Sequence, residues 1–458
     1  MKKRMSETKK QDILFLYLLL ALVISLNSSV AFSGVAKLSW NAPTTNGDGT
    51  PLSDLAGYRV YYGTSSGNYS QNIDAGNVTT YTVANLTDGL TYYFATTAYD
   101  AGGNESGYSN EVIKTVPLGT TLTNLPKTGQ VIGYLYLDDG YIQAGIEWPN
   151  LRFTDNGDGT VTDNLTGLMW LKDGGCIEKE KWKDSLNTVA EFNNNPGDYN
   201  CSGYTANYSD WRLPNVKEIE SIINYGISDS AAWLNSEGFV NVDSSFYWSS
   251  TTHQVDPSYA WSVRMSSGKK VPHLKSFKNY ALLVRNETIS NPYEVPKTGQ
   301  IASYAQGDDN YVQAGIEWPN PRFTDNGDGT VTDNLTGLIW LKDGGCIKKK
   351  KWKDSLNAIA DFNGNPENYN CLGYAANYSD WRLPNVEELE SLINYGVSDS
   401  AAWLNSEGFV GVNFSYYWSS TTHQVNSSKA WIVKMSNGKE IPVLKSYRYY
   451  VWPVRGAQ

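Results

Sequence analysis

The chain has 458 residues and a formal net charge of −10. An acidic balance argues against nucleic acid or an anionic membrane surface as a partner. Tryptophan and tyrosine are abundant, with 16 and 32 residues, whereas methionine is scarce, with five. Many aromatic residues beside Asn, Ser and Gly are typical of extracellular β-rich proteins with polar recognition surfaces.

Residues 1–33 predict a secretory signal peptide. Five lysine and arginine residues lie within the first ten positions, an apolar stretch follows over 13–26, and small residues surround Ala31. This order is typical of a cleaved export signal. A membrane anchor is the alternative, but the apolar run is shorter than the roughly 20 residues that a spanning helix needs. We therefore expect a secreted protein, located extracellularly or at the cell surface.

Residues 35–116 predict an all-β domain. Strand-like alternation recurs over 35–40, 57–62, 80–83 and 91–99, with turn residues between the segments. Short alternating strands of this kind are typical of a β-sandwich. The segment resembles a fibronectin type III domain, with Trp40 on an early strand and Leu86 ahead of Tyr92. That resemblance implies a spacer or an adhesion module.

The rest of the chain contains one sequence twice. After a linker at 117–125, the first repeat covers 126–286; a second linker at 287–295 leads to the second repeat, 296–458. Each landmark recurs 170 positions later, and about three quarters of the aligned positions are identical, which indicates a tandem duplication. Each copy is long enough for a core of its own. Linked binding sites gain from acting together, so the duplication favours binding over catalysis.

The four cysteines occur as one pair in each repeat. In an oxidising compartment this pattern predicts the disulfides Cys176–Cys201 and Cys346–Cys371. Closing loops of about 25 residues would stabilise each repeat by roughly 3 kcal/mol. A zinc site is the alternative, but it needs four ligands and the chain has three histidines.

Each repeat has the periodicity of an α+β domain. In the first repeat, helical spacing over 181–192 and 215–225 predicts two helices. Asn-Gly and Asp-Gly within 153–161 predict a hairpin. The remaining predicted strands are 168–171, 246–252, 260–265 and 283–285.

Three motifs carry a family resemblance. Asp-Trp-Arg-Leu-Pro-Asn at 210–215, Tyr-Trp-Ser-Ser-Thr at 247–251 and the closing Val-Arg at 284–285 all recur in the second repeat. Both repeats resemble the Lcl C-terminal domain family, named for a collagen-like adhesin of Legionella. The resemblance implies two α+β domains of C-type lectin-like fold and binding of polysaccharide, including sulfated glycans. The chain lacks the collagen-like Gly-X-Y tract and the Glu-Pro-Asn signature of calcium-dependent lectins, which leaves trimerisation and calcium-dependent sugar binding without support.

Two sets of residues are candidates for sites. The Asp-rich hairpins are a candidate calcium site, although the spacing lacks the first and twelfth ligands of an EF-hand, and a plain hairpin turn is the alternative. Their acidic residues are Asp155, Asp158, Asp163, Asp325, Asp328 and Asp333. A groove of basic and aromatic residues is the candidate glycan site, with a solvated basic face as the alternative. Its members are His253, Arg264, Lys269, Lys275, Tyr280, His423, Lys434, Lys439, Lys445 and Arg448.

The sequence lacks a catalytic signature. It has no nucleophile elbow and no His-Glu-x-x-His motif. Arg212 and Arg382, between Trp and Leu-Pro, are expected to form structural ion pairs. We therefore predict a non-enzymatic, adhesin-like protein without a required cofactor, which captures extracellular polysaccharide or a cell-surface glycan bivalently. A module that binds a protein ligand is the first alternative, and a polysaccharide-modifying enzyme is the second.

Overall fold

The computed structural model describes residues 36–46, 50–83, 86, 90–115, 125–286, 293–376 and 378–456. The predicted signal peptide, 1–33, lies outside the described residues, as do linker residues 117–124 and 287–292. The chain forms two compact units, 1–122 and 123–458. Within the described ranges, no helix has both the length and the apolar character needed to cross a membrane.

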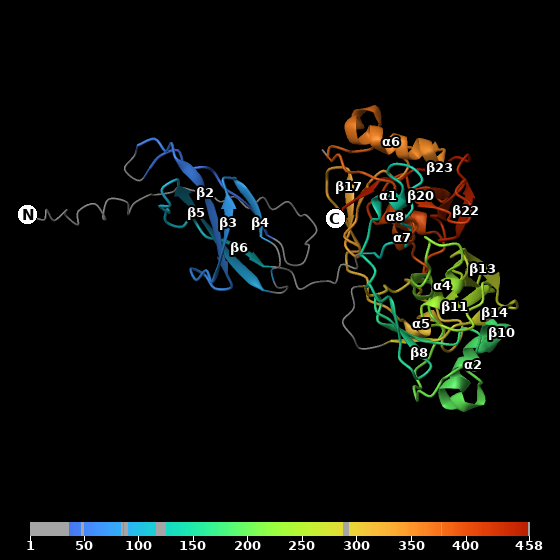
Figure 1. Cartoon of the computed structure of the whole chain (residues 1–458). Helices are drawn as coiled ribbons and strands as arrows, with labels where there is room; N and C mark the ends of the chain where they lie inside the picture. Colours follow the sequence, from blue (N-terminus) through green and yellow to red (C-terminus); the bar gives the residue numbers. More distant parts are fainter. Residues whose placement is uncertain are drawn as a thin grey trace, which may run out of the picture. The chain divides into compact units, whose positions relative to one another are not determined.

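The first unit is an all-β domain of two sheets (Figure 1). One sheet pairs β1 with β4, and the other has the order β3-β2-β5-β6. Trp40, Tyr58 and Phe94 are buried between them. The four predicted strands are confirmed, and the structure adds β3 and β6. The strands are β1 (Ala36–Ser39), β2 (Leu55–Gly63), β3 (Gln71–Gly76), β4 (Thr80–Val83), β5 (Thr91–Asp100) and β6 (Val112–Thr115).

Each repeat combines strands with short helices. The first repeat contains α1 (Asp139–Ile142), β7 (Phe153–Asp155), β8 (Thr160–Asp163), β9 (Leu168–Leu171), β10 (Ile177–Lys181), α2 (Trp182–Asn194), η2 (Pro196–Asp198), α3 (Val216–Ser221), α4 (Ser230–Ser236), β11 (Phe246–Thr252), β12 (Tyr259–Arg264), β13 (Lys270–Leu274), β14 (Lys278–Ala281) and β15 (Val284–Asn286).

The second repeat has the same element order. It contains α5 (Asp309–Val312), β16 (Phe323–Asp325), β17 (Thr330–Asp333), β18 (Ile339–Leu341), β19 (Lys349–Lys350), α6 (Trp352–Gly364), η3 (Pro366–Asn368), α7 (Val386–Ser391), α8 (Ser400–Ser406), β20 (Tyr416–Thr422), β21 (Lys429–Lys434), β22 (Glu440–Leu444), β23 (Tyr449–Tyr450) and β24 (Val454–Arg455).

The two repeats are joined by one mixed sheet of ten strands. Its order is β10-β14-β11-β12-β13-β22-β21-β20-β23-β19, so the repeats meet where β13 pairs antiparallel with β22. Figure 1 shows α2 and α6 at opposite ends of this unit. A four-stranded sheet in each repeat pairs the last strand, β15 or β24, with β9 or β18.

The first residues of each repeat cross to the other repeat. We call 126–150 the first arm and 296–320 the second arm. In Figure 1, α1 of the first arm lies among elements of the second repeat, and α5 lies among elements of the first. The side-chain amide of Gln130 exchanges hydrogen bonds with the backbone of Thr422, and Gln300 does the same with Thr252. The arms are therefore exchanged reciprocally.

The hydrophobic core crosses the boundary between the repeats. Tyr225 meets Trp431 edge to face with ring centroids 5.3 Å apart, and Trp261 meets Tyr395 at 5.5 Å. These aromatic contacts belong to one cluster with members from both repeats, while a second cluster lies in the first repeat. The expectation of a separate core for each copy is met only in part, because arm exchange and the joint sheet bring apolar surfaces together.

The predicted helices are confirmed in position but differ in length. The helix expected over 181–192 is α2, which buries Trp182, Leu186, Val189 and Phe192 as its spacing predicts. The helix expected over 215–225 ends at Ser221. It begins with a capping box between Asn215 and Glu218, which satisfies the first backbone N–H groups. The short helices α1 and α4, and the strands β10, β13 and β14, were not predicted.

Candidate functional site

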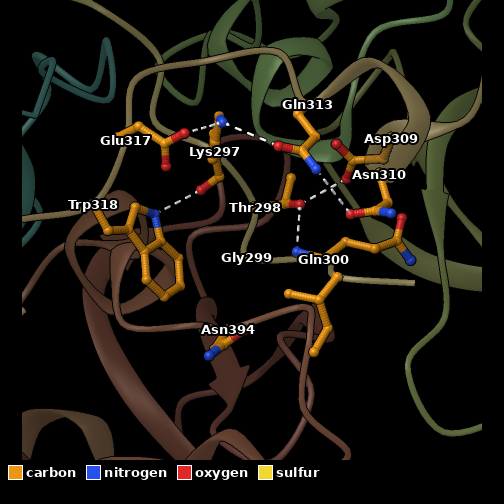
Figure 2. Close-up of a pocket in the computed structure, with 11 residues that line it drawn as sticks. Lys297, Thr298, Gly299, Gln300, Asp309, Asn310, Gln313, Glu317, Trp318 and Asn394 are labelled. Atoms are coloured by element: carbon orange, nitrogen blue, oxygen red, sulfur yellow. Dashed lines mark hydrogen bonds and ion pairs between the residues drawn. The ribbon is translucent and has the colours of Figure 1, made fainter. Parts of the chain in front are cut away.

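A pocket of about 440 Å³ lies along the second arm (Figure 2). Its wall combines one indole ring with amide, hydroxyl, carboxylate and ammonium groups. The lining residues are Lys297, Thr298, Gly299, Gln300, Ile301, Asp309, Asn310, Gln313, Glu317, Trp318 and Asn394. A polar wall with an aromatic ring can accept a hydroxyl-rich ligand through hydrogen bonds and stacking.

Contacts around Trp318 hold the aromatic side of the pocket. Its indole N–H donates a 2.8 Å hydrogen bond to the backbone carbonyl of Lys297. Its ring packs against Trp403, with centroids 5.6 Å apart, and against the Arg322 guanidinium at 4.6 Å. Gly299 has a φ of +86°, and a Cβ there would lie 2.5 Å from Asn394 Oδ1. Glycine is therefore required where the arm passes Asn394.

Asp309 lines the pocket and joins the repeats. Its carboxylate accepts 2.7 Å hydrogen bonds from the hydroxyl of Thr298 in the same arm and from Thr251 in the first repeat. Burial raises the pKa of Asp309 to about 6, although both hydroxyl donors act to lower it. Because a buried carboxyl is costly to ionise, ionisation of Asp309 would weaken the attachment of the second arm to the first repeat.

The rim of the pocket is polar and more exposed. Lys297 forms an ion pair with Glu317, and its ammonium group also donates to Gln313 Oε1 at 3.3 Å. The Gln313 amide donates to Asn310 Oδ1 at 3.4 Å. Because Glu317 neutralises Lys297, the rim presents hydrogen-bonding groups with little net charge.

The first arm carries the same set of residues. Trp148 donates to the Lys127 carbonyl at 2.8 Å, and Asp139 accepts from Thr128 and from Thr421 of the other repeat, each at 2.7 Å. Burial raises the pKa of Asp139 to about 7. Two lining positions differ between the arms: Val131 replaces Ile301, and Gly140 replaces Asn310.

A second pocket, of about 680 Å³, lies between the first arm and the second repeat. Tyr136 and Leu137 of the arm face Asn363, Trp381 and Arg382 across it. Tyr136 is exposed, with its ring 4.8 Å from that of Tyr141. In the second arm, Gln306 and Gly307 replace this tyrosine and leucine.

The structure places the predicted groove residues Lys275 and Lys445 at the arm contacts. The Lys275 ammonium lies 3.6 Å from the ring centre of Trp182 and 5.1 Å from that of Tyr304, and donates to Thr252 Oγ1 at 2.8 Å. Lys445 has the same relation to Trp352, Tyr134 and Thr422. Burial lowers the pKa of each lysine to about 8.

The predicted groove histidines do not lie on an open surface. His253 was expected at the start of an exposed loop, but its side chain is buried against Trp261, and exposure begins at Val255. His423 packs on Trp431 in the same way and is half-buried. Burial lowers the pKa of both imidazoles. These contacts indicate a packing role.

The other predicted groove residues are spread over the ten-stranded sheet. Tyr280 stacks on Tyr247 with ring centroids 5.3 Å apart. Arg264 is exposed and reaches the ring of Phe246. Lys269, Lys434 and Lys439 are half-buried and lie in or beside the β12–β13 and β21–β22 turns, whereas Arg448 is exposed. None of these residues lines either of the two large pockets described above.

The Asp-rich hairpins hold their carboxylates with protein partners. Asp163 is buried and forms a bidentate ion pair with Arg152, at 2.7 and 3.0 Å, and Asp333 pairs likewise with Arg322. Asp155 and Asp325 form ion pairs with Lys172 and Lys342. Asp158 and Asp328 accept from turn residues Thr160 and Thr330.

Within the described residues, no group of three or more His, Cys, Asp or Glu side chains could hold a metal ion. The calcium prediction therefore gains no support, because these carboxylates are occupied.

Two structural predictions are confirmed. The disulfides Cys176–Cys201 and Cys346–Cys371 are present, with Cα atoms 4.9 and 5.0 Å apart. Arg212 forms a bidentate ion pair with Glu218, both contacts being 2.6 Å, and Arg382 pairs with Glu388.

The sequence-based prediction missed the pocket of Figure 2 because its residues have no recognised motif. The usable signal was the unchanged Lys-Thr-Gly-Gln at 127–130 and 297–300, and Glu-Trp-Pro-Asn at 147–150 and 317–320. A duplicated arm that keeps its polar residues while neighbouring positions change indicates a shared structural or binding role. The crossing of the arms could not be read from the sequence.

Comparisons with known proteins match both parts of the chain. A model of the Lcl C-terminal domain matches residues 159–285 and 329–455, more than half of the chain in total. A model of the fibronectin type III domain matches residues 28–115. The arms, 126–150 and 296–320, precede the matched Lcl segments.

Curated relatives match short parts of the chain. A Kelch domain-containing protein of Saccharolobus solfataricus is 33% identical over 22% of this chain and 12% of its own length. An alpha-amylase of Niallia circulans is 30% identical over 28% of this chain and 9% of its own length. The chain thus spans about a tenth of these relatives.

Similar solved structures also cover limited parts. The FN1–FN3 domains of chicken CNTN1 are 16% identical, with a TM-score of 0.17, and cover 21% of this chain and 29% of that chain. A β-1,2-glucanase from Parabacteroides distasonis is 26% identical over 20% of this chain and 12% of that chain, with a TM-score of 0.16.

Proposed function

Because the chain belongs to the Lcl C-terminal domain family, we propose that it is a non-enzymatic, adhesin-like protein that binds polysaccharide outside the cell. The observation that carries this proposal is the pocket beside Trp318, which combines an aromatic ring with amide and hydroxyl groups. Sugars offer hydroxyl groups for these polar side chains and C–H faces for the indole. The C-type lectin-like fold expected of the family belongs to the same proposal.

The rim of the pocket favours hydroxyl-rich sugars over sulfated ones. Lys297 is the only cationic side chain among the described lining residues, and it is already paired with the carboxylate of Glu317. A bound anion would have to compete with that carboxylate. Sulfate recognition generally needs arginine or lysine groups whose charge is not already neutralised. Sulfated and uronic glycans are both anionic, so they are expected to bind more weakly here than neutral ones.

The same residue set on both arms supports bivalent capture. The arms retain the same tryptophan, threonine, glutamine and aspartate, so a polymer with repeated units could contact both arms. Linked weak sites gain overall affinity through a high effective concentration. The disulfides suit an oxidising location, which fits the proposed extracellular setting.

A second candidate function is binding of a protein surface. Exposed apolar and aromatic side chains gather along the first arm, at Val131, Ile132, Tyr134, Tyr136 and Tyr141. Exposed apolar residues of this kind often mark contacts with other proteins.

A glycan array tests the proposal. The chain would be applied to neutral, uronic and sulfated polysaccharides, with calcium and with chelator, beside the double variant Trp148→Ala/Trp318→Ala. We expect hits among the neutral polysaccharides that the double variant loses. Asn310→Gly is a matched control that should keep binding, since glycine is the natural residue at the matching position 140 of the first arm. A blank array for the folded chain would contradict polysaccharide binding and favour the protein ligand.

A further inference from the structure

A cluster of charged side chains is buried where the two repeats meet. Lys270 is fully buried, and its ammonium group lies 2.7 Å from a carboxylate oxygen of Glu220, 2.8 Å from Glu440 and 3.3 Å from Glu390. Lys217 adds a second ammonium group 3.2 Å from Glu390. Burying this many charges is costly unless they are matched, so the pairing of signs matters here.

The charges differ between equivalent positions of the two repeats. Lys270 and Glu440 correspond to one another in the duplication, and they are also direct partners in the β13–β22 ladder. Lys217 and Glu387 correspond in the same way, whereas Glu220 and Glu390 are alike. The first repeat thus contributes lysines where the second contributes glutamates.

Pairing of like repeats would leave these charges unmatched. Two first repeats would place Lys270 against Lys270, with four lysines and two glutamates in the cluster. Two second repeats would place Glu440 against Glu440, with six glutamates and no lysine. Only the mixed pair places lysine opposite glutamate in the β13–β22 ladder, and an unpaired buried charge is strongly destabilising.

Protonation allows the mixed cluster to balance. Burial raises the pKa values of Glu387 and Glu440 well above the usual range, while the Lys270 ammonium acts to lower both. Burial also acts to raise the pKa of Glu390, but Lys217 and Lys270 outweigh it and lower that pKa to about 2. The two ammonium groups therefore face at least one firmly ionised carboxylate.

The polar contacts of the exchanged arms cannot make this distinction. Gln130 and Gln300, and Asp139 and Asp309, are the same residue types and form matching contacts with the opposite repeat. A first arm would therefore find the same threonine and backbone partners on another first repeat. Selectivity must come from positions where the repeats differ.

We infer that four residues form a recognition surface that makes each repeat pair with the other repeat and not with a second copy of itself. These residues are Lys217, Lys270, Glu387 and Glu440. The partner is a copy that carries glutamate where the first repeat carries lysine. That partner is normally the second repeat of the same chain, and the second repeat of another chain has the same chemistry. This inference does not depend on the ligand.

Charge exchange in the full chain tests the inference. Lys270→Glu or Glu440→Lys alone should lower Tm by roughly 10 °C, because each leaves like charges facing one another in the interior. Lys270→Glu combined with Glu440→Lys should recover most of that loss. Lys269→Glu, at a half-buried neighbouring position, is the control and should change Tm little. Single variants with the Tm of the wild type would overturn the inference. So would a double variant whose Tm falls by as much as the two single variants together.

Mixing two altered chains tests partner choice directly. The variant Lys217→Glu/Lys270→Glu has two glutamate-bearing repeats, and Glu387→Lys/Glu440→Lys has two lysine-bearing repeats. Refolded together, they should form a complex with one copy of each chain, measured by light scattering, with a higher Tm than either alone. If each refolds alone to a monomer of wild-type Tm, or if the mixture forms no complex, the inference is wrong.

Discussion

The carboxylate of Asp139 in the first repeat accepts a 2.7 Å hydrogen bond from the hydroxyl of Thr421 in the second repeat. Asp309 and Thr251 form the same contact in the reverse direction, also at 2.7 Å. Each contact lies within buried surroundings, so each repeat depends on a buried carboxyl supplied by the other. This reciprocity explains why the tandem pair forms one compact unit.

Stability should depend on pH through Asp139. Its pKa is about 7 in the folded chain against an ordinary value of 3.8, with burial as the largest cause. The folded state keeps a proton that the unfolded state has released, so the free energy of unfolding should fall as pH rises from about 4 to about 7. Full ionisation should cost on the order of 4 kcal/mol.

Replacing Asp139 with Asn should make this part of the pH profile less steep and leave the share of Asp309, whose pKa is raised to about 6, measured by denaturant unfolding between pH 4 and 8. Asp198→Asn, at an exposed position, is the matched control and should leave the profile unchanged. An Asp139→Asn profile that still falls as steeply as the wild type would assign the pH dependence to other buried groups, such as Glu387 and Glu440.

Removing the partner hydroxyl should weaken the arm contact. Thr421→Val keeps the shape of the side chain but removes the donor to Asp139 and the acceptor for the backbone N–H of Val386. Leaving buried polar groups unpaired should lower the free energy of unfolding by roughly 1–3 kcal/mol. Thr251→Val should have a matching effect, because it removes the equivalent hydrogen bonds to Asp309 and Val216. No loss of stability in either variant would show that the hydroxyls are dispensable.

The disulfides should add stability without defining the fold. Cys176→Ser combined with Cys201→Ser should lower the free energy of unfolding by about 3 kcal/mol, since the bond closes a 25-residue separation. The double variant at Cys346 and Cys371 should behave alike, because that separation is equal. Lower denaturant midpoints together with near-native circular dichroism spectra would confirm this prediction. Complete unfolding of either variant in buffer would contradict it.

The pocket under the first arm should owe part of its specificity to Tyr136. Tyr136→Gln introduces the residue found at the matching position 306, and Gln306→Tyr makes the opposite exchange. Because Tyr136 is exposed, we expect Tm to stay the same while binding of ligands that use this pocket falls several-fold. Identical array profiles for wild type and both variants would show that these positions do not contribute to recognition.

The sequence predicted local structure better than it predicted the relation between repeats. The β7–β8 hairpin, the buried face of α2 and both disulfides follow from turn residues, periodicity and cysteine spacing, which are local signals. The exchange of arms depends on contacts such as Gln130 with Thr422, separated by 292 positions, which no local pattern encodes. His253 illustrates the same limit, since a polar residue after a strand was expected to be exposed and is instead packed on Trp261.

The surroundings of two predicted site residues could not be predicted for a related reason. Lys275 and Lys445 appeared to be free basic residues, but aromatic rings from both repeats surround them. Sequence spacing indicates which residues share a strand or a helix face, whereas the cover provided by a distant arm is a property of the assembled structure.

The most direct test is a calorimetric titration of the chain with a short oligosaccharide from the strongest array hit. We expect two binding sites per wild-type chain, one after Trp148→Ala or Trp318→Ala, and none in the double variant, with each variant first shown to be folded by circular dichroism. A stoichiometry that stays the same in the folded double variant would contradict the assignment of polysaccharide binding to the pocket at Trp318 and the matching residues around Trp148.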